Sequence, residues 1–545
     1  MKRIRPFILL ITVVLSALVA FGLWSLPGNL SGKRCSKVSP LGFDPQRVVE
    51  DIEVISKDHH SVIHTPQRTE VRQYLMGRLR ELGAEPKVYT FPGLRSRGYT
   101  FDASDVVADF PPLSDSCATR LLLVAHYDSR YPWKPVRDTV CSYGAADDGY
   151  GLGVALETAR CLLERRPEWK QGLRILFTDA EEVGMEGMKS LFSNNTELFE
   201  DVGLVINIEA RGPFGPALLF ETSEGNEALL KLYSDNARYP YTYSLTNVVY
   251  SFLPNFTDFT VVKDSIPGMN FSTIADINHY HTDKDNFSFV NPSSILHYGE
   301  QILPVALAYI SGQEYGNPDA LRSDSNRVFF TIPLLGLLRF SKGWYIVLNV
   351  IVLLLFALLV FLNRGNLRGV GVQMCISLGI ALGALVAGEV LSLLGCLASG
   401  ARFKLFGVVT GMGFDNVLMI VSAVALLSVV VLLYWKKCKT GTRLFATALL
   451  LAIFSIVLLC TIGDNMFTLI PLALFTLALL LWQSTSLKLF LLASISLLIL
   501  HSFSFLYALS MALTVGALGA VLMIASLDMI ILVGLCDCYL MTGKD

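Results

Sequence analysis

The sequence predicts an α/β domain with a mostly parallel central sheet flanked by helices, joined to a domain of several membrane-spanning helices. Hydrophobic residues make up 52% of the 545 residues and charged residues only 17%, whereas about 25% charged residues is usual in soluble proteins. The apolar residues are unevenly placed, because residues 33–326 mix charge with short apolar runs and long apolar stretches dominate from Gly343 onward. The net charge of -2 and sequence pI near 6.5 give no sign of nucleic-acid binding.

The N-terminus predicts a membrane anchor. The basic residues Lys2, Arg3 and Arg5 precede about 20 apolar residues, which is long enough to cross a bilayer core of about 30 Å. A cleaved signal peptide is the alternative, but the apolar run is longer than usual for one and no small-residue cleavage motif ends it. We therefore expect three parts, which are an anchor over residues 1–32, a large domain over residues 33–326 and a helical domain over residues 327–545.

Seven apolar segments in the last part of the chain predict helices that cross the lipid bilayer. They cover residues 343–362, 370–396, 415–435, 444–462, 466–482, 489–508 and 511–536. The connections 363–369 and 436–443 are the most basic, and they share the side of the N-terminus if every segment crosses once. Because basic loops stay in the cytoplasm, we expect both termini there, and residues 33–326 on the extracytoplasmic or lumenal side of a bacterial plasma membrane or eukaryotic endomembrane. The loop with Arg402 and Lys404 is an exception.

Two features of this apolar region have more than one interpretation. Glu389 lies inside the second segment, where an acid is either functional or a structural residue that is hydrogen-bonded to a neighbouring helix. Residues 328–340 are short for a span and are interrupted by Pro333 and Gly336, so we expect an interfacial segment there.

Apolar runs alternate with helix-length amphipathic stretches in residues 33–326. Leu121–Ala125, Leu173–Phe177 and Leu204–Glu209 are rich in Leu, Ile and Val, and amphipathic stretches separate them. This alternation favours a largely parallel sheet that is buried on both faces. In such sheets, ligands bind beyond the carboxyl ends of the strands.

Histidine and carboxylate side chains gather at these strand ends and in two further segments. In chain order they are His126 and Asp128 in "HYDS", Asp147 and Asp148 in "GAADDGYGLG", Glu181 and Glu182 in "TDAEE", Glu209 in "NIEARG", and His279 and His281 in "NHYHTDKDN". Each motif alone is weak evidence, because a histidine after a strand is more often a loop residue and Asp-Asp-Gly is more often a turn. Together they are the ligand types that zinc takes in a nitrogen and oxygen site.

This ordered set of motifs resembles the two-zinc aminopeptidase family, which includes vacuolar and secreted bacterial aminopeptidases. The resemblance covers roughly residues 45–312. With an anchor before it and apolar segments after it, the chain is most similar to the membrane-embedded branch, which includes vacuolar membrane proteases and endoplasmic reticulum metallopeptidases. The resemblance implies an exopeptidase fold, two Zn²⁺ per chain, peptide substrates and aminopeptidase activity.

The resemblance also implies a ligand set. His126 would bind one zinc with Glu182 completing its surroundings, and Asp147 would bridge the two ions. Glu209 and His281 would supply the remaining ligands, one to each metal.

Two further acids have implied roles outside the ligand set. Asp128 would orient the imidazole of His126 and raise its basicity. Glu181 would be the general base that takes a proton from a metal-activated water, which then attacks a peptide carbonyl.

Several alternatives stay open at this point. Asp148 could replace Asp147 as the bridge, and His279 could replace His281. Glutaminyl cyclase shares this fold and several ligands, but it has tryptophan where this chain has Tyr280. A catalytically inactive peptidase-fold receptor or scaffold is a third possibility, although such relatives lose ligands and none is missing here.

Overall fold

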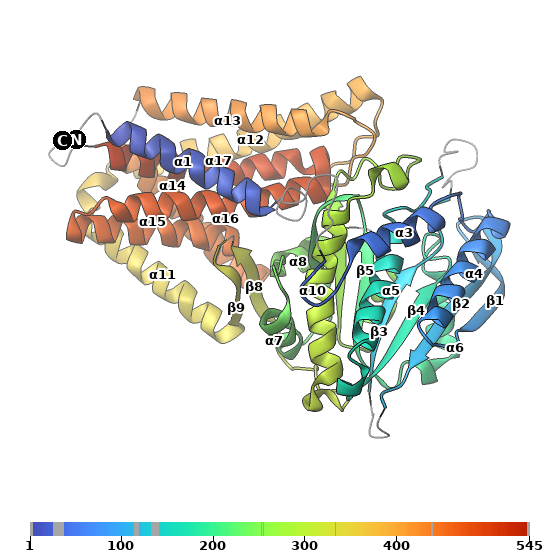
Figure 1. Ribbon diagram of the computed structural model, residues 1–545. Helices are drawn as coiled ribbons and strands as arrows, with labels where there is room; N and C mark the ends of the chain where they lie inside the picture. The colour runs from blue at the N-terminus through green and yellow to red at the C-terminus, as the bar shows by residue number, and fades with distance from the viewer. Residues whose placement is uncertain are drawn as a thin grey trace. The chain divides into compact units, whose positions relative to one another are not determined.

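The computed structural model describes residues 4–24, 38–113, 119–131, 141–251, 253, 255–332, 334–437 and 440–541. The chain divides into two compact units (Figure 1). One unit, here called the α/β unit, comprises residues 25–331 and 336–341. The other, here called the helical unit, comprises residues 1–24, 332–335 and 342–545.

A seven-stranded mixed sheet with the order β1-β2-β4-β3-β5-β7-β6 forms the centre of the α/β unit. Its strands are β1 (Lys87–Ser96), β2 (Tyr99–Phe110), β3 (Arg120–His126), β4 (Gly172–Thr178), β5 (Val202–Ala210), β6 (Phe214–Thr222) and β7 (Gly268–Ala275). The four neighbours β4, β3, β5 and β7 run parallel, and β1, β2 and β6 add antiparallel pairs at the two sides. The predicted mostly parallel sheet is confirmed, and β3, β4 and β5 are the three predicted strands.

Helices cover both faces of this sheet (Figure 1). Along β3, Leu121 and Leu123 pack into one hydrophobic core, while Leu122 and Val124 pack into the other, as expected for alternating side chains of a strand. The first core contains residues of α3 (Pro45–Ile55), α4 (Thr65–Glu81), α5 (Gly149–Leu163), α7 (Glu227–Asn236) and α10 (Pro292–Ser311), and the second contains residues of α6 (Glu186–Asn194) and α9 (Asp258–Val262). A further helix, α8 (Ser244–Ser251), packs against β6.

Capping residues define where two of these helices begin. Asp44 accepts a hydrogen bond from the backbone N–H of Gln46 at the start of α3, and Asn291 accepts from two backbone N–H groups at the start of α10. A proline follows each cap, and its fixed φ and missing N–H suit the first helical position.

Two further strands, β8 (Arg327–Ile332) and β9 (Gly336–Ser341), form a two-stranded sheet. The β-branched and aromatic residues of β8 favour a strand, and Gly336 has φ +80°, which glycine adopts without strain. The segment expected at the membrane interface is therefore β structure, which its hydropathy alone did not indicate.

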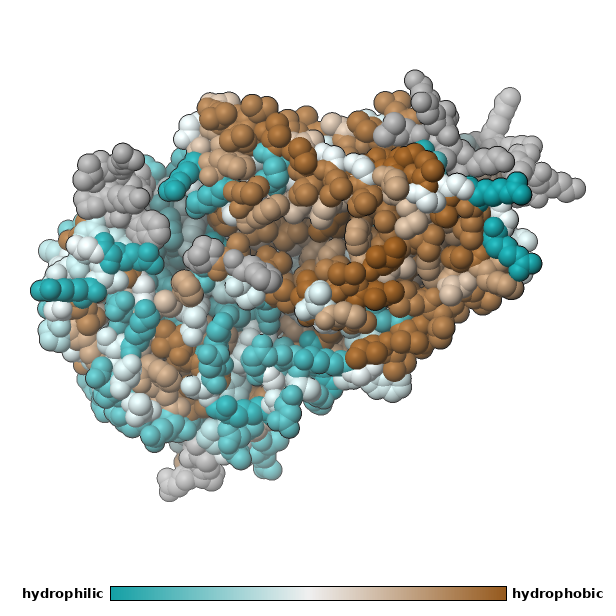
Figure 2. All heavy atoms as spheres, turned by 180° about the vertical axis from the view of Figure 1, so that it is seen from behind, coloured by the Kyte–Doolittle hydropathy of each residue, from teal (hydrophilic) through white to brown (hydrophobic). Residues whose placement is uncertain are grey.

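The helical unit contains a helix at each predicted membrane span. These are α1 (Arg5–Trp24), α11 (Lys342–Leu362), α12 (Val370–Ser399), α13 (Asp415–Lys437), α14 (Thr440–Thr461), α15 (Met466–Thr485), α16 (Leu489–Leu513) and α17 (Leu518–Leu540). Seven segments of the described chain are long and apolar enough to cross a membrane, and the last of them holds both α16 and α17. Large apolar side chains cover the outside of this unit (Figure 2), with Leu354 65% and Leu397 71% exposed, as expected for a surface that faces lipid.

Glu389 has a structural contact in the helical unit. Its Oε1 accepts a hydrogen bond of 3.1 Å from the backbone N–H of Gly519, in the first turn of α17, where N–H groups lack partners within their own helix. A Cβ atom added to Gly388 would lie 2.6 Å from the Cα of Gly519, so α12 and α17 pack closely here because both residues are glycine. This contact favours the structural interpretation of Glu389.

Candidate metal centre

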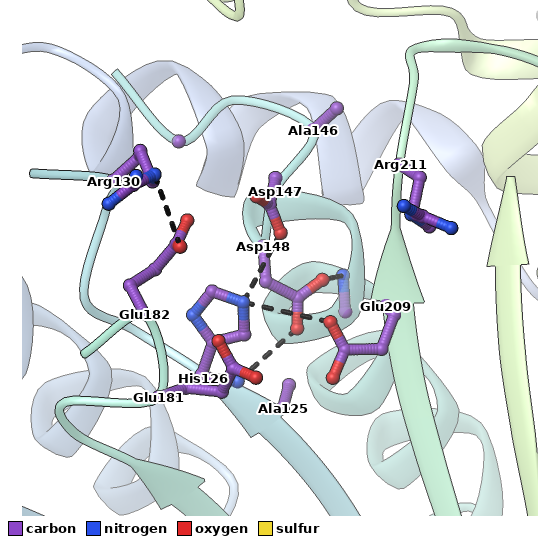
Figure 3. A network of polar contacts seen from close by, with 12 residues as sticks. Ala125, His126, Arg130, Ala146, Asp147, Asp148, Glu181, Glu182, Glu209 and Arg211 are labelled. Atoms are coloured by element: carbon purple, nitrogen blue, oxygen red, sulfur yellow. Dashed lines mark hydrogen bonds and ion pairs between the residues drawn. The ribbon is translucent and has the colours of Figure 1, made fainter. Parts of the chain in front are cut away.

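The carboxyl ends of the parallel strands bring the predicted ligands together (Figure 3). His126 is the last residue of β3, and it pairs in register with Thr178, the last residue of β4. Glu181 and Glu182 follow β4 after Asp179 and Ala180, and Glu209 lies near the end of β5. Because the parallel strands end at one edge of the sheet, these side chains meet there.

Two groups of three candidate ligands share Asp147. In the first, His126 Nε2 lies 3.2 Å from Asp147 Oδ1 and 3.7 Å from Glu209 Oε2. In the second, His281 Nε2 lies 3.3 Å from Asp147 Oδ2 and 3.1 Å from Glu182 Oε1. Asp147 therefore offers one carboxylate oxygen to each group.

The spacing and the chemistry of both groups fit divalent cations. Bonds of about 2.0–2.2 Å in a tetrahedral zinc site place neighbouring ligand atoms roughly 3.3–3.6 Å apart, close to the separations found here. Asp147 Oδ2 and Glu182 Oε1 are buried and accept no hydrogen bond from the described residues. Buried carboxylate oxygens without a partner are costly, and a cation would satisfy both.

The structure groups Glu182 with a different histidine from the one that the family resemblance implies. Glu182 lies with His281 and not with His126, whose group contains Glu209 instead. Between β4 and the two glutamates, Ala180 adopts a left-handed conformation with φ +60°. The direction in which adjacent side chains leave such a turn depends on backbone geometry, which the order of residues does not reveal.

Both carboxylate oxygens of Asp148 accept hydrogen bonds from backbone N–H groups. Its Oδ1 accepts the N–H of Gly151 at 3.0 Å, which makes Asp148 the N-cap of α5, and its Oδ2 accepts the N–H of His126 at 3.2 Å. Asp147 is thereby the member of the pair that faces the imidazoles.

His279 lies apart from both ligand groups. Its Nδ1 is 3.2 Å from Asp276 Oδ2, and its ring packs against Phe289 with ring centroids 4.2 Å apart. Of the two candidate histidines, only His281 belongs to a group of candidate ligands in the described part of the chain.

Asp128 contacts His126 mainly through its main chain. The Nδ1 of His126 is 3.0 Å from the carbonyl oxygen of Asp128 but 3.6 Å from its carboxylate. A hydrogen bond from Nδ1–H to this carbonyl leaves Nε2 available as a ligand. The carboxylate instead accepts the backbone N–H groups of Glu181 at 2.9 Å and Glu182 at 3.3 Å, so Asp128 fixes the turn that carries both glutamates.

Glu181 is half-buried beside His126 and belongs to neither ligand group (Figure 3). Burial raises the pKa of its carboxyl well above the usual value, and the negative charge of Glu209 adds to the rise, while His126 opposes it. No described residue donates a hydrogen bond to this carboxylate, so it can accept a proton from a bound water or substrate group.

Asp285 supports the loop of Asp147, a role that the sequence did not suggest. Its carboxylate accepts hydrogen bonds from the backbone N–H of Ala146 at 2.7 Å, the backbone N–H of Asp147 at 3.2 Å and the hydroxyl of Ser142 at 2.9 Å. Its place four residues after His281 was the one available signal, because burial of a single aspartate is not visible in a sequence.

Arg130 also contacts the candidate ligands. Its Nε donates a hydrogen bond of 3.2 Å to His281 Nδ1 and lies 3.8 Å from Glu182 Oε2. A neutral histidine that holds a cation through Nε2 carries its ring proton on Nδ1, so this hydrogen bond from Arg130 would be lost when a cation binds.

Comparison with known proteins identifies the α/β unit. Residues 105–306, which include every candidate ligand, match the sequence profile described as Peptidase family M28. The chain contains a peptidase family M28 domain. Members of this family depend on zinc in general, in agreement with the ligand types found here.

Two curated relatives of the chain are named as membrane or organelle proteases. The vacuolar membrane protease of Schizosaccharomyces pombe is 28% identical over 269 residues, which are 46% of this chain and 30% of the relative. The endoplasmic reticulum metallopeptidase 1 of Rattus norvegicus is 26% identical over 274 residues, which are 50% of this chain and 29% of the relative. The matched stretch thus spans less than a third of these relatives, and together with the apolar helices they support a membrane location.

Among solved structures, the chain is similar to a Zn-dependent exopeptidase from Parabacteroides distasonis. The two are 19% identical with a TM-score of 0.39, and the match covers 49% of this chain and 98% of that chain.

Replacement of Asp285 tests its support of the Asp147 loop. Asp285→Ala leaves two backbone N–H groups without their acceptor, which costs roughly 1–3 kcal/mol when such groups stay buried. We expect a lower midpoint of thermal unfolding and weaker metal retention, measured on the full chain in detergent. Asp283→Ala is the matched control, because Asp283 is exposed and should change stability by less than about 0.5 kcal/mol. Equal midpoints for the two variants would contradict this role.

Proposed function

We propose that the chain is a membrane-anchored zinc aminopeptidase that hydrolyses N-terminal residues from peptides. The observation that carries the proposal is the pair of ligand groups that share Asp147, with an uncommitted glutamate beside them. His126 and Glu209 would hold one zinc and Glu182 and His281 the other, with Asp147 bridging. When bound, the zinc ions would supply Lewis acidity, which lowers the pKa of water and polarises a peptide carbonyl.

Glu181 would act as the general base. It lies outside the ligand groups at the same edge of the sheet, where its carboxylate would take a proton from the attacking water and return it to the leaving amine. Asp128 supports this role by holding the backbone N–H of Glu181. The preference for N-terminal residues rests on the resemblance to aminopeptidases.

The competing functions have less support from the site. An inactive scaffold does not need all five ligand positions, yet the structure brings all of them into two groups. Glutaminyl cyclase has tryptophan before the last ligand histidine, whereas Tyr280 precedes His281 in this chain.

We also propose that residues 1–32 anchor the chain, that residues 33–326 are extracytoplasmic or lumenal, and that residues 327–545 cross the membrane several times. In the helical unit, the ends of several helices contact one another, which supports placing them on the same, cytoplasmic side of the membrane. Arg5 Nη1 donates to the carbonyl oxygen of Met541 at 3.2 Å, and Lys488 Nζ donates to that of Tyr539 at 2.6 Å. The start of α1, the α15–α16 connection and the end of α17 therefore lie together, with basic side chains among them, as the positive-inside rule requires of cytoplasmic segments.

Glu181→Gln tests the general base. The amide keeps the shape of the side chain but cannot accept a proton, so we expect hydrolysis of aminoacyl reporter substrates to fall by about 10²- to 10⁴-fold with unchanged zinc content and unfolding midpoint. Glu186→Gln is the matched control, because Glu186 lies in the first turn of α6 outside the ligand groups and should keep full activity. Normal turnover in Glu181→Gln would rule out this role.

Protease protection tests the orientation. An epitope tag after Asp545 and another inserted after Asn317 should lie on opposite sides of sealed membrane vesicles. One proposed span precedes Asn317 and seven follow it, so Asn317 lies across the membrane from both termini. We expect added protease to remove only one of the two tags. Removal of both tags from intact vesicles of one orientation would show that the assignment is wrong.

A further inference from the structure

Arg211 lies at the rim of the candidate metal centre. It is two residues after Glu209 and directly follows the end of β5. Its backbone N–H is bonded to the carbonyl oxygen of Thr273 at 2.9 Å and lies 3.1 Å from the hydroxyl of Ser272, which fixes the residue against β7. In Figure 3 its side chain stands beside Glu209, on the other side of the ligands from Arg130.

Aromatic stacking connects the guanidinium of Arg211 to a candidate ligand. The guanidinium carbon lies 5.3 Å from the ring centroid of Tyr280. The ring of Tyr280 stacks on His281, with centroids 3.6 Å apart and an interplanar angle of 23°. The guanidinium is therefore no further from the imidazole than these two separations together, and the aromatic face restricts its motion.

The charge of Arg211 has no carboxylate partner among the described residues, although the side chain is half-buried. Several other half-buried or buried arginines of the α/β unit do pair with carboxylates, although half-buried Arg72, Arg165 and Arg166 have no such partner among the described residues. These pairs are Arg68–Asp179, Arg78–Asp51, Arg120–Asp109, Arg160–Glu157 and Arg174–Asp109. The nearby ligand carboxylates face His126 and His281 instead, so the five N–H donors of this planar cation are available to an anion that enters the site.

We propose that Arg211 binds a carboxylate of the substrate and directs the enzyme toward short peptides in which a carboxylate lies within one residue of the cleaved bond. This inference rests on the proposed peptidase function. In a dipeptide the C-terminal carboxylate lies one residue beyond the cleaved bond, and one Cα–Cα step is about 3.8 Å. A guanidinium reaches a carboxylate over about 2.7–2.9 Å, so an arginine at the rim can hold the end of a dipeptide whose cleaved bond lies at the ligands. An acidic side chain next to the bond offers the same group.

Steady-state kinetics on matched substrates test the inference. The full chain in detergent is assayed with leucyl-alanine, leucyl-alanine amide, leucyl-aspartate α-amide and glutamyl-alanine amide. We expect wild-type protein to favour at least one carboxylate-bearing substrate over leucyl-alanine amide by roughly 10- to 100-fold in kcat/KM, the range of a hydrogen-bonded charge pair. Arg211→Ala should abolish this preference, mainly through KM, because it should lose far more kcat/KM on the preferred substrate than on leucyl-alanine amide. Preference for leucyl-alanine identifies the C-terminal carboxylate as the ligand, and preference for either acidic amide identifies a side chain.

Two variants separate binding from structure. Arg211→Lys keeps the charge but loses the bidentate geometry, so it should recover only part of the preference. Arg95→Ala, an exposed arginine of β1, should behave as wild type. Equal wild-type rates on the four substrates, or an equal loss on all four in Arg211→Ala, would overturn the inference while leaving the peptidase proposal intact. No hydrolysis of any substrate by wild-type protein would overturn the peptidase proposal and this inference with it.

Discussion

The position of one carboxylate, that of Asp147, determines the geometry of the candidate centre. Its two oxygens lie 3.2 and 3.3 Å from the Nε2 atoms of His126 and His281, residues that are far apart in the sequence. Two neighbours keep Asp147 in place. Asp148 ties the same loop to the start of α5 and to β3, and Asp285 accepts the N–H of Asp147 itself. The central sheet in turn fixes the strand ends from which the other ligands project.

This arrangement concentrates negative charge in a buried place. Burial raises the pKa of Glu209 to about 8, with Asp147 adding to the rise and His126 opposing it, and burial raises the pKa of Asp285 to about 7. Each shift reports that the ionised carboxylate is disfavoured by loss of water. Divalent cations would reverse this, because they bind the folded site and stabilise its ionised ligands. The same ions would then contribute to both the proposed function and the stability of the domain.

The sequence predicted the elements that local patterns encode. The parallel strands β3, β4 and β5 followed from Leu-, Ile- and Val-rich runs, and the helices of the helical unit followed from hydropathy. The candidate ligands were predictable because each lies at a strand end or in a short motif. The grouping of Glu182 with His281 was not, because it depends on the turn at Ala180. The partners of Glu389 and Asp285 are distant in sequence, so no local pattern could reveal their hydrogen bonds.

Zinc content per chain is the direct test of whether Asp147 joins two zinc sites. The full chain, purified in detergent and freed of loose metal, is compared with its Asp147→Asn variant after both are shown to be folded. We expect about two zinc ions per wild-type chain and fewer than about one in the variant, since the shared ligand serves both groups. A folded wild-type chain without bound metal, or a variant that retains two zinc ions, would contradict this expectation.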